Sequence, residues 1–290
     1  MGVELIQLPW HRITSLHCGT GTAEVVSCRT REELLHAAGE YPGMKILGGG
    51  TNTVGSDRDG IRVLRLLQPE SGFEIIDGGK GIASLSGGAS FSASITALAK
   101  CGLGGMSALA GIPGSVGGAA AMNAGANGGE IADFILEMEG VSLNGGAIWK
   151  WRREEGGFGY RTSPRPEDVV ITSVMLRLRQ VEPESEMAAV TAEKQRRARV
   201  TPSGFSAGSV FRNPPEAPAG KMLEEAGCKG LVQGNLMVSC QHANWIVNPT
   251  REPASAEDAL RLTEIMADKV LASHGVRLQC EWKFIDGKKR

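Results

Sequence analysis

A stretch of glycine and alanine that is almost free of charge runs from Gly102 to Glu130 and constrains this chain more than any other feature. A flexible linker would be more polar, and an ordinary core would contain more leucine, isoleucine and phenylalanine. Because glycine has no Cβ and adopts positive φ angles, such a backbone can lie against a flat or phosphorylated ligand and aim several N–H groups at one point. The alternative is a tightly packed small-residue helix that binds no ligand.

Within this stretch, the residues Gly111-Ile112-Pro113-Gly114 predict a turn, and Ser115 is a suitable N-cap for a short helix. We expect that helix at residues 116–122. A helix N-terminus that follows directly on a glycine turn favours an anion. The segment 111–118 is therefore a candidate phosphate-binding segment.

A second glycine loop, GGGTN at residues 48–52, follows a short predicted strand at residues 45–47. The loop ends in two hydrogen-bonding side chains, Thr51 and Asn52, which makes it a second candidate phosphate loop. It is not the dinucleotide fingerprint GxGxxG, because position 53 is Thr53, and the P-loop pattern GxxxxGK[ST] does not occur in the chain. On its own, this loop is equally compatible with a simple tight turn.

The overall composition is that of a globular protein. The chain has 290 residues, of which 41% are hydrophobic and 22% charged, enough for one large domain or about two. The net charge is −1 and no basic face is evident, so we expect no nucleic-acid partner. No apolar run approaches the ~18 residues of a membrane span, and the N-terminus carries Glu4 and no apolar segment, so we expect neither a membrane partner nor a signal peptide.

The six cysteines are scattered along the chain without a CxxC pair. This spacing favours neither a zinc site nor a redox motif, and a chain of this length does not depend on disulfides. We therefore interpret the cysteines as reduced core thiols of a cytoplasmic protein, and we expect no metal site.

Predicted strands occur in clusters with helices between them, without strict βα alternation, which is typical of an α+β fold. Thr30 with Glu33 forms a capping-box pattern, and Ser90 is a suitable cap for the next helix. Further helices are expected at residues 184–199, 219–226 and 255–273. Strands are expected at 23–28, 61–66, 73–76, 82–86, 134–143, 147–151, 169–178, 236–239, 243–247 and 276–285, and small-residue or turn-rich loops at 158–163 and 206–214.

Two further features concern the second half of the chain. The composition changes near Thr201, which predicts a boundary at about 180–200. The helix before it has a basic end, formed by Lys194, Arg196, Arg197 and Arg199. A solvated helix C-terminus explains this run better than a binding site, because positive charge is favoured there by the helix dipole.

Taken together, six segments resemble the UDP-N-acetylenolpyruvoylglucosamine reductase family. They occur in the order typical of that family and extend over nearly the whole chain. The segments are ILGGGTN (46–52), GIPGSVGGAAAMNAGANGGEI (111–131), GYRTS (159–163), SAGSVFRNP (206–214), HANWIVN (242–248) and GVRLQCEW (275–282). Each is modest alone, but all six in register are highly specific.

The resemblance implies an α+β fold with a two-lobed FAD-binding domain of the vanillyl-alcohol-oxidase type at residues 1–180 and a smaller α+β substrate domain at residues 181–290. It implies non-covalent FAD, NADPH as reductant and a UDP-sugar nucleotide as substrate, reduced to UDP-N-acetylmuramate. None of the five histidines falls within a glycine loop, so a covalent histidyl-flavin is not expected. The implied cofactor-binding residues are Gly48, Gly49, Gly50, Thr51, Asn52, Gly111, Ile112, Pro113, Gly114, Ser115, Gly117 and Gly118.

The same resemblance implies three catalytic residues. Arg161 matches the arginine that supports the carboxylate of the intermediate, Ser209 matches the proton donor, and Glu281 matches the late glutamate that stabilises or protonates the intermediate. Tyr160, Arg212 and Asn213 are candidates for substrate contacts. Without the family register, a structural ion pair, an N-cap and a surface carboxylate would be the simpler interpretations of the three catalytic positions.

The chain departs from the family pattern at residues 18–23, at Thr51, at Asn127, where tyrosine is common, and at Thr162, where aspartate is common. Two other functions stay open from the sequence. One is a flavin-dependent oxidoreductase of the same fold that acts on another sugar or alcohol. The other is a nucleotide-sugar-binding protein without catalysis, which would have no need for all three catalytic residues.

Overall fold

The computed structural model of the protein describes residues 3–68 and 72–286. The chain packs as two compact units, and each unit is built from separate stretches of sequence. Unit 1 contains Met1–Leu5, Val25–Gly49 and Arg62–Arg199, and unit 2 contains Ile6–Glu24, Gly50–Ile61 and Val200–Arg290. The change from unit 1 to unit 2 after Arg199 falls within the boundary interval of 180–200 that the composition predicts. The division into functional domains at residue 180, which the family resemblance implies, stays a prediction.

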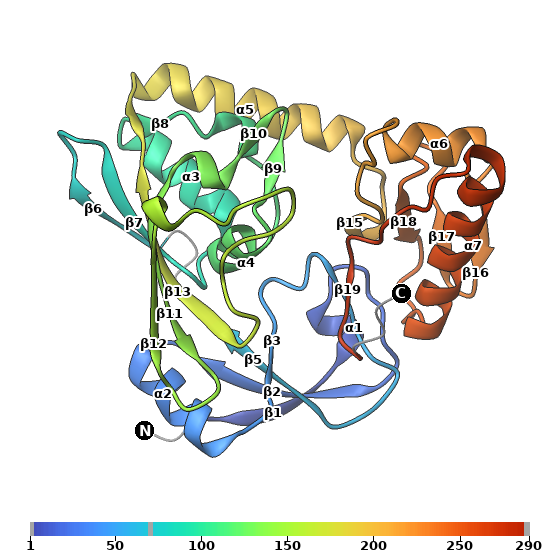
Figure 1. Ribbon diagram of the computed structural model, residues 1–290, viewed down its shortest axis with the longest axis horizontal. Helices are drawn as coiled ribbons and strands as arrows, with labels where there is room; N and C mark the ends of the chain where they lie inside the picture. Colours follow the sequence, from blue (N-terminus) through green and yellow to red (C-terminus); the bar gives the residue numbers. More distant parts are fainter. Residues whose placement is uncertain (1–2, 69–71, 287–290) are drawn as a thin grey trace. The chain divides into compact units, whose positions relative to one another are not determined.

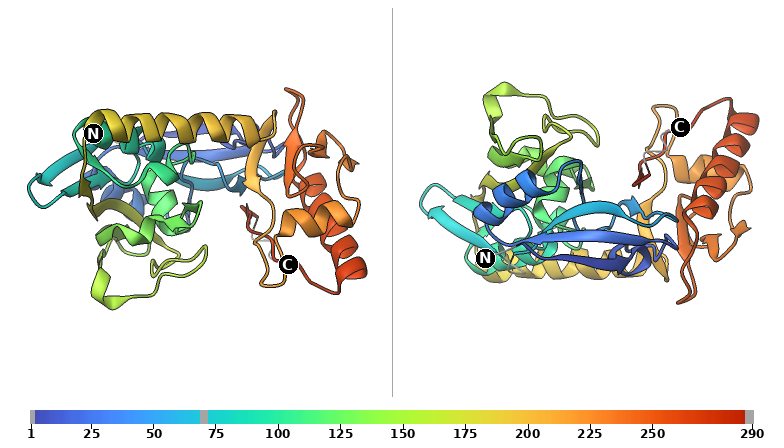
Figure 2. Two further views of the ribbon diagram at one scale, coloured as in Figure 1. Left: turned by 90° about the horizontal axis from the view of Figure 1, so that it is seen from above. Right: turned by 90° about the horizontal axis from the view of Figure 1, so that it is seen from below.

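The main layer of unit 1 is a five-stranded antiparallel sheet (Figure 1). At one edge of the sheet, β11 and β12 form the hairpin predicted around Asn144-Gly145-Gly146, and Gly145 and Gly146 adopt the positive φ angles of 88° and 71° that such a turn requires. The outer hairpin of β6 and β7 extends beyond the helices of this unit (Figure 2). In order across the sheet, the strands are β12 (Ile148–Arg152), β11 (Ile135–Ser142), β13 (Val169–Arg177), β7 (Ile82–Ser86) and β6 (Phe73–Asp77).

Two capped helices pack on this sheet and close its core. Helix α3 (Phe91–Lys100) begins after Ser90, whose hydroxyl accepts from the Ala93 N–H at 3.4 Å, and the short helix α4 (Val116–Ala121) begins after Ser115. Both caps confirm the predictions from sequence. Phe91 has no exposed surface and packs with apolar residues of the sheet, so this part of unit 1 has a core of its own.

A second, smaller core lies around helix α2 (Arg31–Glu40). The helix begins with the predicted capping box, in which Thr30 and Glu33 each bond to the backbone of the other. Leu34 of α2 and Val26 of β2 are both fully buried in this core. Two separate cores in unit 1 agree with the predicted two-lobed organisation. Strand β2 belongs to a four-stranded sheet with the order β1 (Leu5–Pro9), β2 (Thr22–Cys28), β5 (Ile61–Leu66) and β3 (Lys45–Ile46).

Unit 2 contains a four-stranded antiparallel sheet on which two helices pack, and a short third helix near its start. Helix α6 (Ala219–Glu225) and helix α7 (Ala256–His274) share one apolar core with the sheet, in which Leu223 and Met266 are fully buried. A separate parallel pair, β4 (Thr53–Val54) with β19 (Lys283–Phe284), joins the 50–61 stretch to the end of the chain. The sheet runs in the order β15 (Phe205–Ser209), β18 (Trp245–Asn248), β17 (Leu236–Val238) and β16 (Val232–Gln233).

The first turn of α7 is held by a carboxylate from a distant loop. Asp57 accepts hydrogen bonds from the backbone N–H groups of Ala256 at 2.9 Å and Glu257 at 3.0 Å, and from the Ser255 hydroxyl at 2.8 Å. Burial opposes the charged form, but these hydrogen bonds and one from Thr20 outweigh it and lower the pKa of Asp57 to about 2. A negative charge at a helix N-terminus is also favoured by the helix dipole.

Several predictions about local structure are wrong. The segment 276–285, predicted as one strand, contains only β19 and an isolated bridge between Cys280 and Phe211. It is not continuous because Cys280 pairs with Phe211, whereas β19 pairs with β4. The predicted loop at 206–214 begins as strand β15. Cys101 and Cys240 are exposed and are therefore not core thiols.

The short helix α1 (Trp10–Ile13) and six two-residue strands were not predicted. A pattern of period 2 or 3.6 needs more residues than these elements contain, so the sequence carries no signal for them. The strands are β4 and, further along the chain, β8 (Leu103–Gly104), β9 (Gly125–Ala126), β10 (Gly129–Glu130), β14 (Arg179–Gln180) and β16 (Val232–Gln233).

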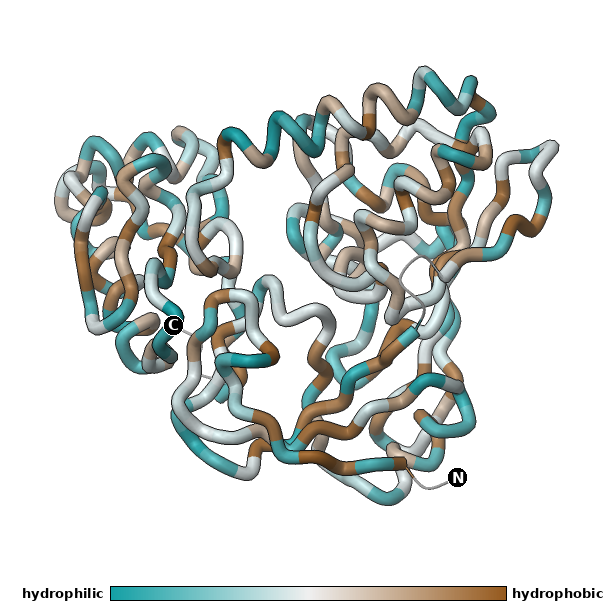
Figure 3. Tube along the Cα trace, turned by 180° about the vertical axis from the view of Figure 1, so that it is seen from behind, coloured by the Kyte–Doolittle hydropathy of each residue, from teal (hydrophilic) through white to brown (hydrophobic). Residues whose placement is uncertain are grey.

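Helix α5 (Pro183–Val200) confirms the predicted helix but only part of its interpretation. Its C-terminal half is hydrophilic (Figure 3), and Arg199 is exposed as expected of a solvated end. Lys194 and Arg197, however, face the rest of unit 1: the Lys194 ammonium donates to the Thr96 hydroxyl at 2.7 Å, and the Arg197 side chain is 23% exposed. The basic run is therefore not solvated throughout.

None of the helices in residues 3–68 and 72–286 combines the length and the apolar character that crossing a membrane requires. Over the same residues, no group of three or more histidine, cysteine, aspartate or glutamate side chains is placed to hold a metal ion.

Candidate active site

The two glycine loops meet in unit 1. A Cβ on Gly49 would lie 2.7 Å from the Gly114 Cα, and a Cβ on Gly48 would lie 2.9 Å from the Ser115 hydroxyl oxygen. Any larger residue would therefore force the two loops apart. The close packing of the loops already requires glycine at positions 48 and 49, and it shows that segments more than sixty residues apart in the sequence form one surface.

The two loops contribute backbone groups and hydroxyls to this surface, and the side chains of Arg197 and Lys194 lie beside Gly111. Gly111 and Gly114 have φ angles of 80° and 108°, and the Ser115 hydroxyl accepts from the Gly118 N–H at 3.2 Å. The N–H groups of Gly111, Ile112, Val116, Gly117 and Gly118 donate to protein oxygens, so a phosphate at this turn would bind the N–H groups of Gly114 and Ser115. The donor set, which contains no carboxylate, fits the pyrophosphate of a flavin dinucleotide. The segment is completed by Ile112, Pro113 and Gly117, and a Cβ on Gly117 would lie 3.0 Å from the Gly87 carbonyl oxygen.

The continuation of the first loop, Gly50-Thr51-Asn52, belongs to unit 2. Gly50 has a φ of 67°, and a Cβ there would lie 2.1 Å from the Ile13 carbonyl oxygen, so only glycine fits. The Asn52 amide donates to the Glu281 carbonyl at 3.2 Å, and the Lys283 N–H donates to the Asn52 carbonyl at 3.0 Å. The end of the glycine loop thus lies beside the segment that contains the predicted catalytic glutamate.

Arg161 of unit 1 lies on a tight turn. Gly159 and Thr162 exchange backbone hydrogen bonds of 3.2 and 3.0 Å, with Tyr160 and Arg161 between them. Arg161 has a φ of 57°, a left-handed conformation that is unfavourable for a residue with a Cβ. Its guanidinium carbon lies 5.0 Å from the centre of the Tyr160 ring, and its Nη2 donates to the Gly125 carbonyl at 3.3 Å.

Ser209 of unit 2 follows a β-bulge. Ser206 pairs with Val247 and Ser209 with Trp245, so β15 has one more residue than β18 between the two pairs. Gly208 lies in the bulge with a φ of 78°, and nothing lies within 4 Å of a Cβ placed on it. A bulge changes the direction in which the following side chain points, so it decides where the Ser209 hydroxyl is presented.

Backbone hydrogen bonds join the Ser209 strand to the Glu281 segment. The Glu281 N–H donates to the Val210 carbonyl at 2.8 Å, and the Arg212 N–H donates to the Gln279 carbonyl at 2.9 Å. Two of the three predicted catalytic residues therefore come from segments that are paired within unit 2. Arg161 belongs to unit 1, so the predicted catalytic set is divided between the units.

Asn244 was not predicted, although it lies in the HANWIVN segment. Its side chain is buried, accepts from the Phe211 N–H at 2.9 Å and donates to the Phe211 carbonyl at 2.8 Å, and its own carbonyl accepts from the Val210 N–H at 3.0 Å. Asn244 therefore holds the chain directly after Ser209 in the way a neighbouring strand would. The sequence signal that could have indicated this role is the position of Asn244, a polar residue directly before the apolar strand β18.

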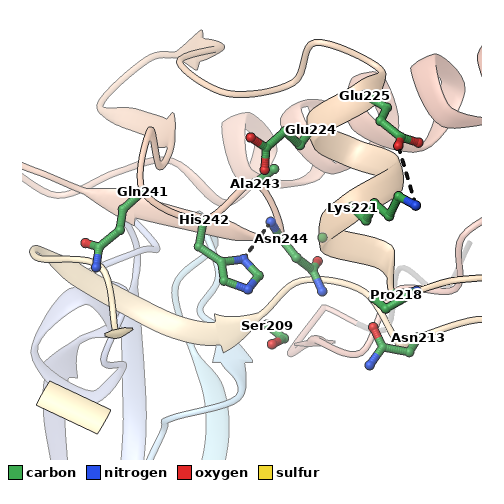
Figure 4. A pocket seen from close by; sticks show the side chains of 11 residues that line it. Ser209, Asn213, Pro218, Lys221, Glu224, Glu225, Gln241, His242, Ala243 and Asn244 are labelled. Carbon is green, nitrogen blue, oxygen red and sulfur yellow. Dashed lines mark hydrogen bonds and ion pairs between the residues drawn. The ribbon is translucent and has the colours of Figure 1, made fainter. Parts of the chain in front are cut away.

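Ser209 lines a pocket of about 620 Å³ that lies wholly in unit 2 (Figure 4). The predicted residue Asn213 also lines it, and its side-chain oxygen accepts from the Ala219 N–H at the start of α6 at 3.0 Å. Polar side chains from α6 and from the segment before β18 complete the wall. The lining residues are Ser209, Asn213, Pro218, Gly220, Lys221, Glu224, Glu225, Gln241, His242, Ala243 and Asn244.

His242 is a titratable residue in the wall of this pocket. Its Nδ1 accepts from the Asn244 N–H at 3.2 Å, so in the neutral ring the proton is on Nε2 (Figure 4). Burial lowers the pKa of His242 below its ordinary value, which keeps the ring neutral. A Cβ on Gly220 would lie 2.9 Å from the His242 Cε1, so glycine at that position makes room for the ring.

Two family models match the chain. The model described as "UDP-N-acetylenolpyruvoylglucosamine reductase, C-terminal domain" matches residues 201–285, which include Ser209 and Glu281. The model described as "FAD binding domain" matches residues 22–150, which include both glycine loops. Arg161 lies between the two matched regions.

Curated relatives and a solved structure resemble the chain over nearly its full length. A UDP-N-acetylenolpyruvoylglucosamine reductase of Thermus thermophilus is 36% identical over 272 residues, which cover 93% of this chain and 95% of the relative. The enzyme of the same name from Myxococcus xanthus is 36% identical, with coverage of 95% and 90%. The crystal structure of UDP-N-acetylenolpyruvylglucosamine reductase from Thermus caldophilus superposes with a TM-score of 0.83 at 32% identity, covering 97% of this chain and 99% of that one.

Proposed function

Because this chain belongs to the UDP-N-acetylenolpyruvoylglucosamine reductase family, we propose that Arg161, Ser209 and Glu281 are the residues that carry out its reaction. The protein is an FAD-dependent oxidoreductase. With NADPH as reductant, it reduces UDP-N-acetylglucosamine enolpyruvate to UDP-N-acetylmuramate, a precursor of peptidoglycan. When bound, FAD supplies the redox step by accepting a hydride from NADPH and delivering it to the substrate.

The two glycine loops are the part of the chain that we assign to FAD. In this proposal, the N–H groups of residues 48–50, 114 and 115 and the hydroxyls of Thr51 and Ser115 hold the pyrophosphate and the ring system. The other residues of the segment 111–118 shape it, because the N–H groups of Gly111, Ile112, Val116, Gly117 and Gly118 donate to protein oxygens and Pro113 has no N–H. The support is the joining of the two loops in unit 1 and their uncharged donor set. We also keep the functional division into an FAD-binding part, residues 1–180, and a substrate-binding part, residues 181–290.

The remaining chemistry requires charge stabilisation and a proton. Hydride addition at the methylene carbon of the enolpyruvyl group leaves negative charge on the α-carbon, which spreads into the carboxylate. The guanidinium of Arg161 would hold the carboxylate oxygens while they gain charge. The hydroxyl of Ser209 would donate its proton to the α-carbon, and Glu281 would stabilise or protonate the same intermediate.

The observation that carries this proposal is the pairing of the Ser209 strand with the Glu281 segment next to a pocket that Ser209 lines. We assign the pocket to the UDP-sugar nucleotide, with Asn213 in its wall, and we assign Arg212 and Tyr160 to further substrate contacts.

The proposed location is the cytoplasm. The support is chemical: NADPH is the reductant, and all six cysteines are free thiols. Burial raises the pKa of Cys28 to about 11, which keeps this thiol protonated and unreactive.

The test separates the two half-reactions under anaerobic conditions. NADPH should bleach the yellow flavin of the wild-type protein, and the enolpyruvyl sugar nucleotide should restore the colour. Ser209→Ala should keep the first step and slow the second by about 10²- to 10⁴-fold. Ser273→Ala, which removes an exposed hydroxyl at the end of α7 in the same unit, serves as the matched control and should leave both steps unchanged.

The other outcomes have defined meanings. Colour that returns with oxygen but not with the enolpyruvyl nucleotide would indicate a different oxidoreductase. A colourless protein that cannot be reconstituted with FAD would indicate a non-catalytic binding protein. Normal re-oxidation in Ser209→Ala would remove Ser209 from the mechanism.

A further inference from the structure

Asn123 is a buried polar residue that the reaction described above does not use. It has no exposed surface, and its φ of 42° places it in the left-handed region. Both ends of its amide are bonded: Nδ2 donates to the Gly159 carbonyl at 3.0 Å, and Oδ1 accepts from the Ala132 N–H at 3.2 Å. Gly159 is the first residue of the turn that carries Arg161, so Asn123 is bonded directly to the base of that turn.

The Arg161 turn needs support from outside itself. The backbone of Gly159 and Thr162 exchanges one pair of hydrogen bonds, and Arg161 between them is held at a φ of 57°. Left-handed backbone at a residue with a Cβ persists only where surrounding contacts hold it. A second contact comes from Ser163, whose hydroxyl donates to the Ala121 carbonyl at 3.1 Å.

Hydrogen bonds from the turn at residues 159–163 reach one short segment, residues 121–125. Gly159, Arg161 and Ser163 bond to Asn123, Gly125 and Ala121 respectively, which lie at or just beyond the C-terminal end of helix α4. The N-terminal end of α4 is the capped glycine segment that we assign to FAD. Helix α4 is therefore a rigid connection between the proposed flavin loop and the turn that carries Arg161.

We propose that Asn123 is the positioning residue for Arg161, a proposal that rests on the proposed role of Arg161 in the reaction. The position demands three properties at once: a left-handed backbone, a donor for Gly159 and an acceptor for Ala132. Asparagine supplies all three. Glycine would supply only the backbone conformation, and aspartate would supply the conformation and the acceptor but no donor.

Asn127 offers a matched control four residues further along. It is also an asparagine in the left-handed region, with a φ of 52°, but its side chain bonds to Glu193 and Arg196 of helix α5 and not to the Arg161 turn. Asn127→Gly therefore reproduces the backbone change of Asn123→Gly without touching the proposed support of Arg161.

The kinetic test measures the two half-reactions in the FAD-loaded Asn123→Gly and Asn123→Asp variants. Reduction by NADPH should stay within about threefold of the wild-type rate, and re-oxidation by the enolpyruvyl nucleotide should slow by about 10- to 100-fold, as expected for a displaced catalytic group. The Asn123→Gly/Arg161→Ala double variant should be no slower than Arg161→Ala, because a positioning residue has no effect once its target is gone. Asn127→Gly should match the wild type.

A structural readout accompanies the kinetics. Hydrogen–deuterium exchange of the peptide that contains residues 158–163 should accelerate about tenfold in both Asn123 variants, with FAD and without it, because the Thr162 amide is protected by the turn. The same peptide should exchange at the wild-type rate in Asn127→Gly.

The outcomes distinguish this inference from the proposed function. Normal re-oxidation in Arg161→Ala would overturn the role of Arg161 itself. A slow Arg161→Ala with normal Asn123 variants, or additive losses in the double variant, would overturn only the positioning role. Loss of folding or of FAD in both Asn123 variants, with a normal Asn127→Gly, would assign Asn123 to stability alone and would equally overturn it.

Discussion

The two units hold their proposed catalytic residues by different means. In unit 1, Arg161 lies on a strained turn whose support comes from side chains, chiefly Asn123 and Ser163. In unit 2, Ser209 and Glu281 lie on segments joined by backbone hydrogen bonds. A single substitution can remove a hydrogen bond made by a side chain, whereas most substitutions leave the hydrogen bonds between two backbone segments in place.

This difference indicates where each unit is vulnerable. Unit 1 should lose the placement of Arg161 with little loss of stability, since the turn lies outside its two cores. Unit 2 should tolerate most substitutions near Ser209 except at two positions. These are Asn244, which replaces a missing strand, and Gly208, which forms the bulge.

The largest effect is expected for Asn244→Ala. The substitution leaves the N–H and carbonyl of Phe211 without their buried partner, which should lower the free energy of unfolding by about 2 to 4 kcal/mol. Urea denaturation measures this loss. Asn235→Ala, which removes one exposed hydrogen bond to the Pro253 carbonyl, is the control and should cost less than about 0.5 kcal/mol. Equal losses in the two variants would contradict the special role of Asn244.

The next effect is expected for Gly208→Ala. No atom lies within 4 Å of the added methyl group, so the change acts only through the φ of 78° and should cost about 1 to 2 kcal/mol. Gly230→Ala is a close control, because Gly230 has the same φ of 78° outside the pocket. Both variants should lose similar stability, but only Gly208→Ala should lose turnover, by about tenfold, because it moves Ser209. Unchanged turnover in Gly208→Ala would show that the bulge does not place the serine.

A smaller effect is expected for Ser163→Ala in unit 1. It removes one of the two side-chain supports of the Arg161 turn and should cost about 1 kcal/mol. Re-oxidation by substrate should slow by less than in the Asn123 variants, because the Asn123 bond to Gly159 remains. Thr191→Ala, which removes an exposed hydroxyl bond on α5, should not change re-oxidation at all. A greater loss in Ser163→Ala than in Asn123→Gly would reverse the proposed order of the two supports.

The smallest effect concerns Asp57, a side-chain support in unit 2, and tests whether the contrast between the units is general. Its folded pKa of about 2 lies below the unfolded value of about 3.9, so the ionised carboxylate contributes its full stabilisation above about pH 4 and loses it as the pH falls towards 2. Asp57→Asn should cost about 1 kcal/mol at pH 7, since the carboxylate is largely exposed.

The pH dependence is measured by urea denaturation between pH 7 and pH 2.5. The difference between wild type and Asp57→Asn should shrink towards the acid end, whereas Asp268→Asn, further along α7, should show almost no difference at pH 7. A constant difference across the pH range would mean that the charge of Asp57 does not stabilise the helix.

Much of the local structure could be predicted because its causes are local. The caps at Thr30, Ser90 and Ser115 depend on residues three positions apart, and the hairpin at residues 144–146 depends on its own turn. The family could be recognised because six segments keep their order along the chain.

The structural predictions that were wrong concerned residues whose contacts are far away in the sequence. The segment 276–285 had the composition of a strand, yet it divides its pairing between Phe211 and the Thr53–Val54 strand. Lys194 and Arg197 looked like a solvated helix end because nothing nearby in sequence indicates the surface that they contact.

The amino-acid sequence by itself therefore determined the elements, their caps and the family, since these follow from spacing along the chain. Only the tertiary structure decided that Asn123 supports the turn of Arg161, that Asn244 takes the place of a strand, and that a bulge at Gly208 precedes Ser209. The physical reason is that a hydrogen-bond partner thirty or more residues away leaves no pattern in the sequence around either residue.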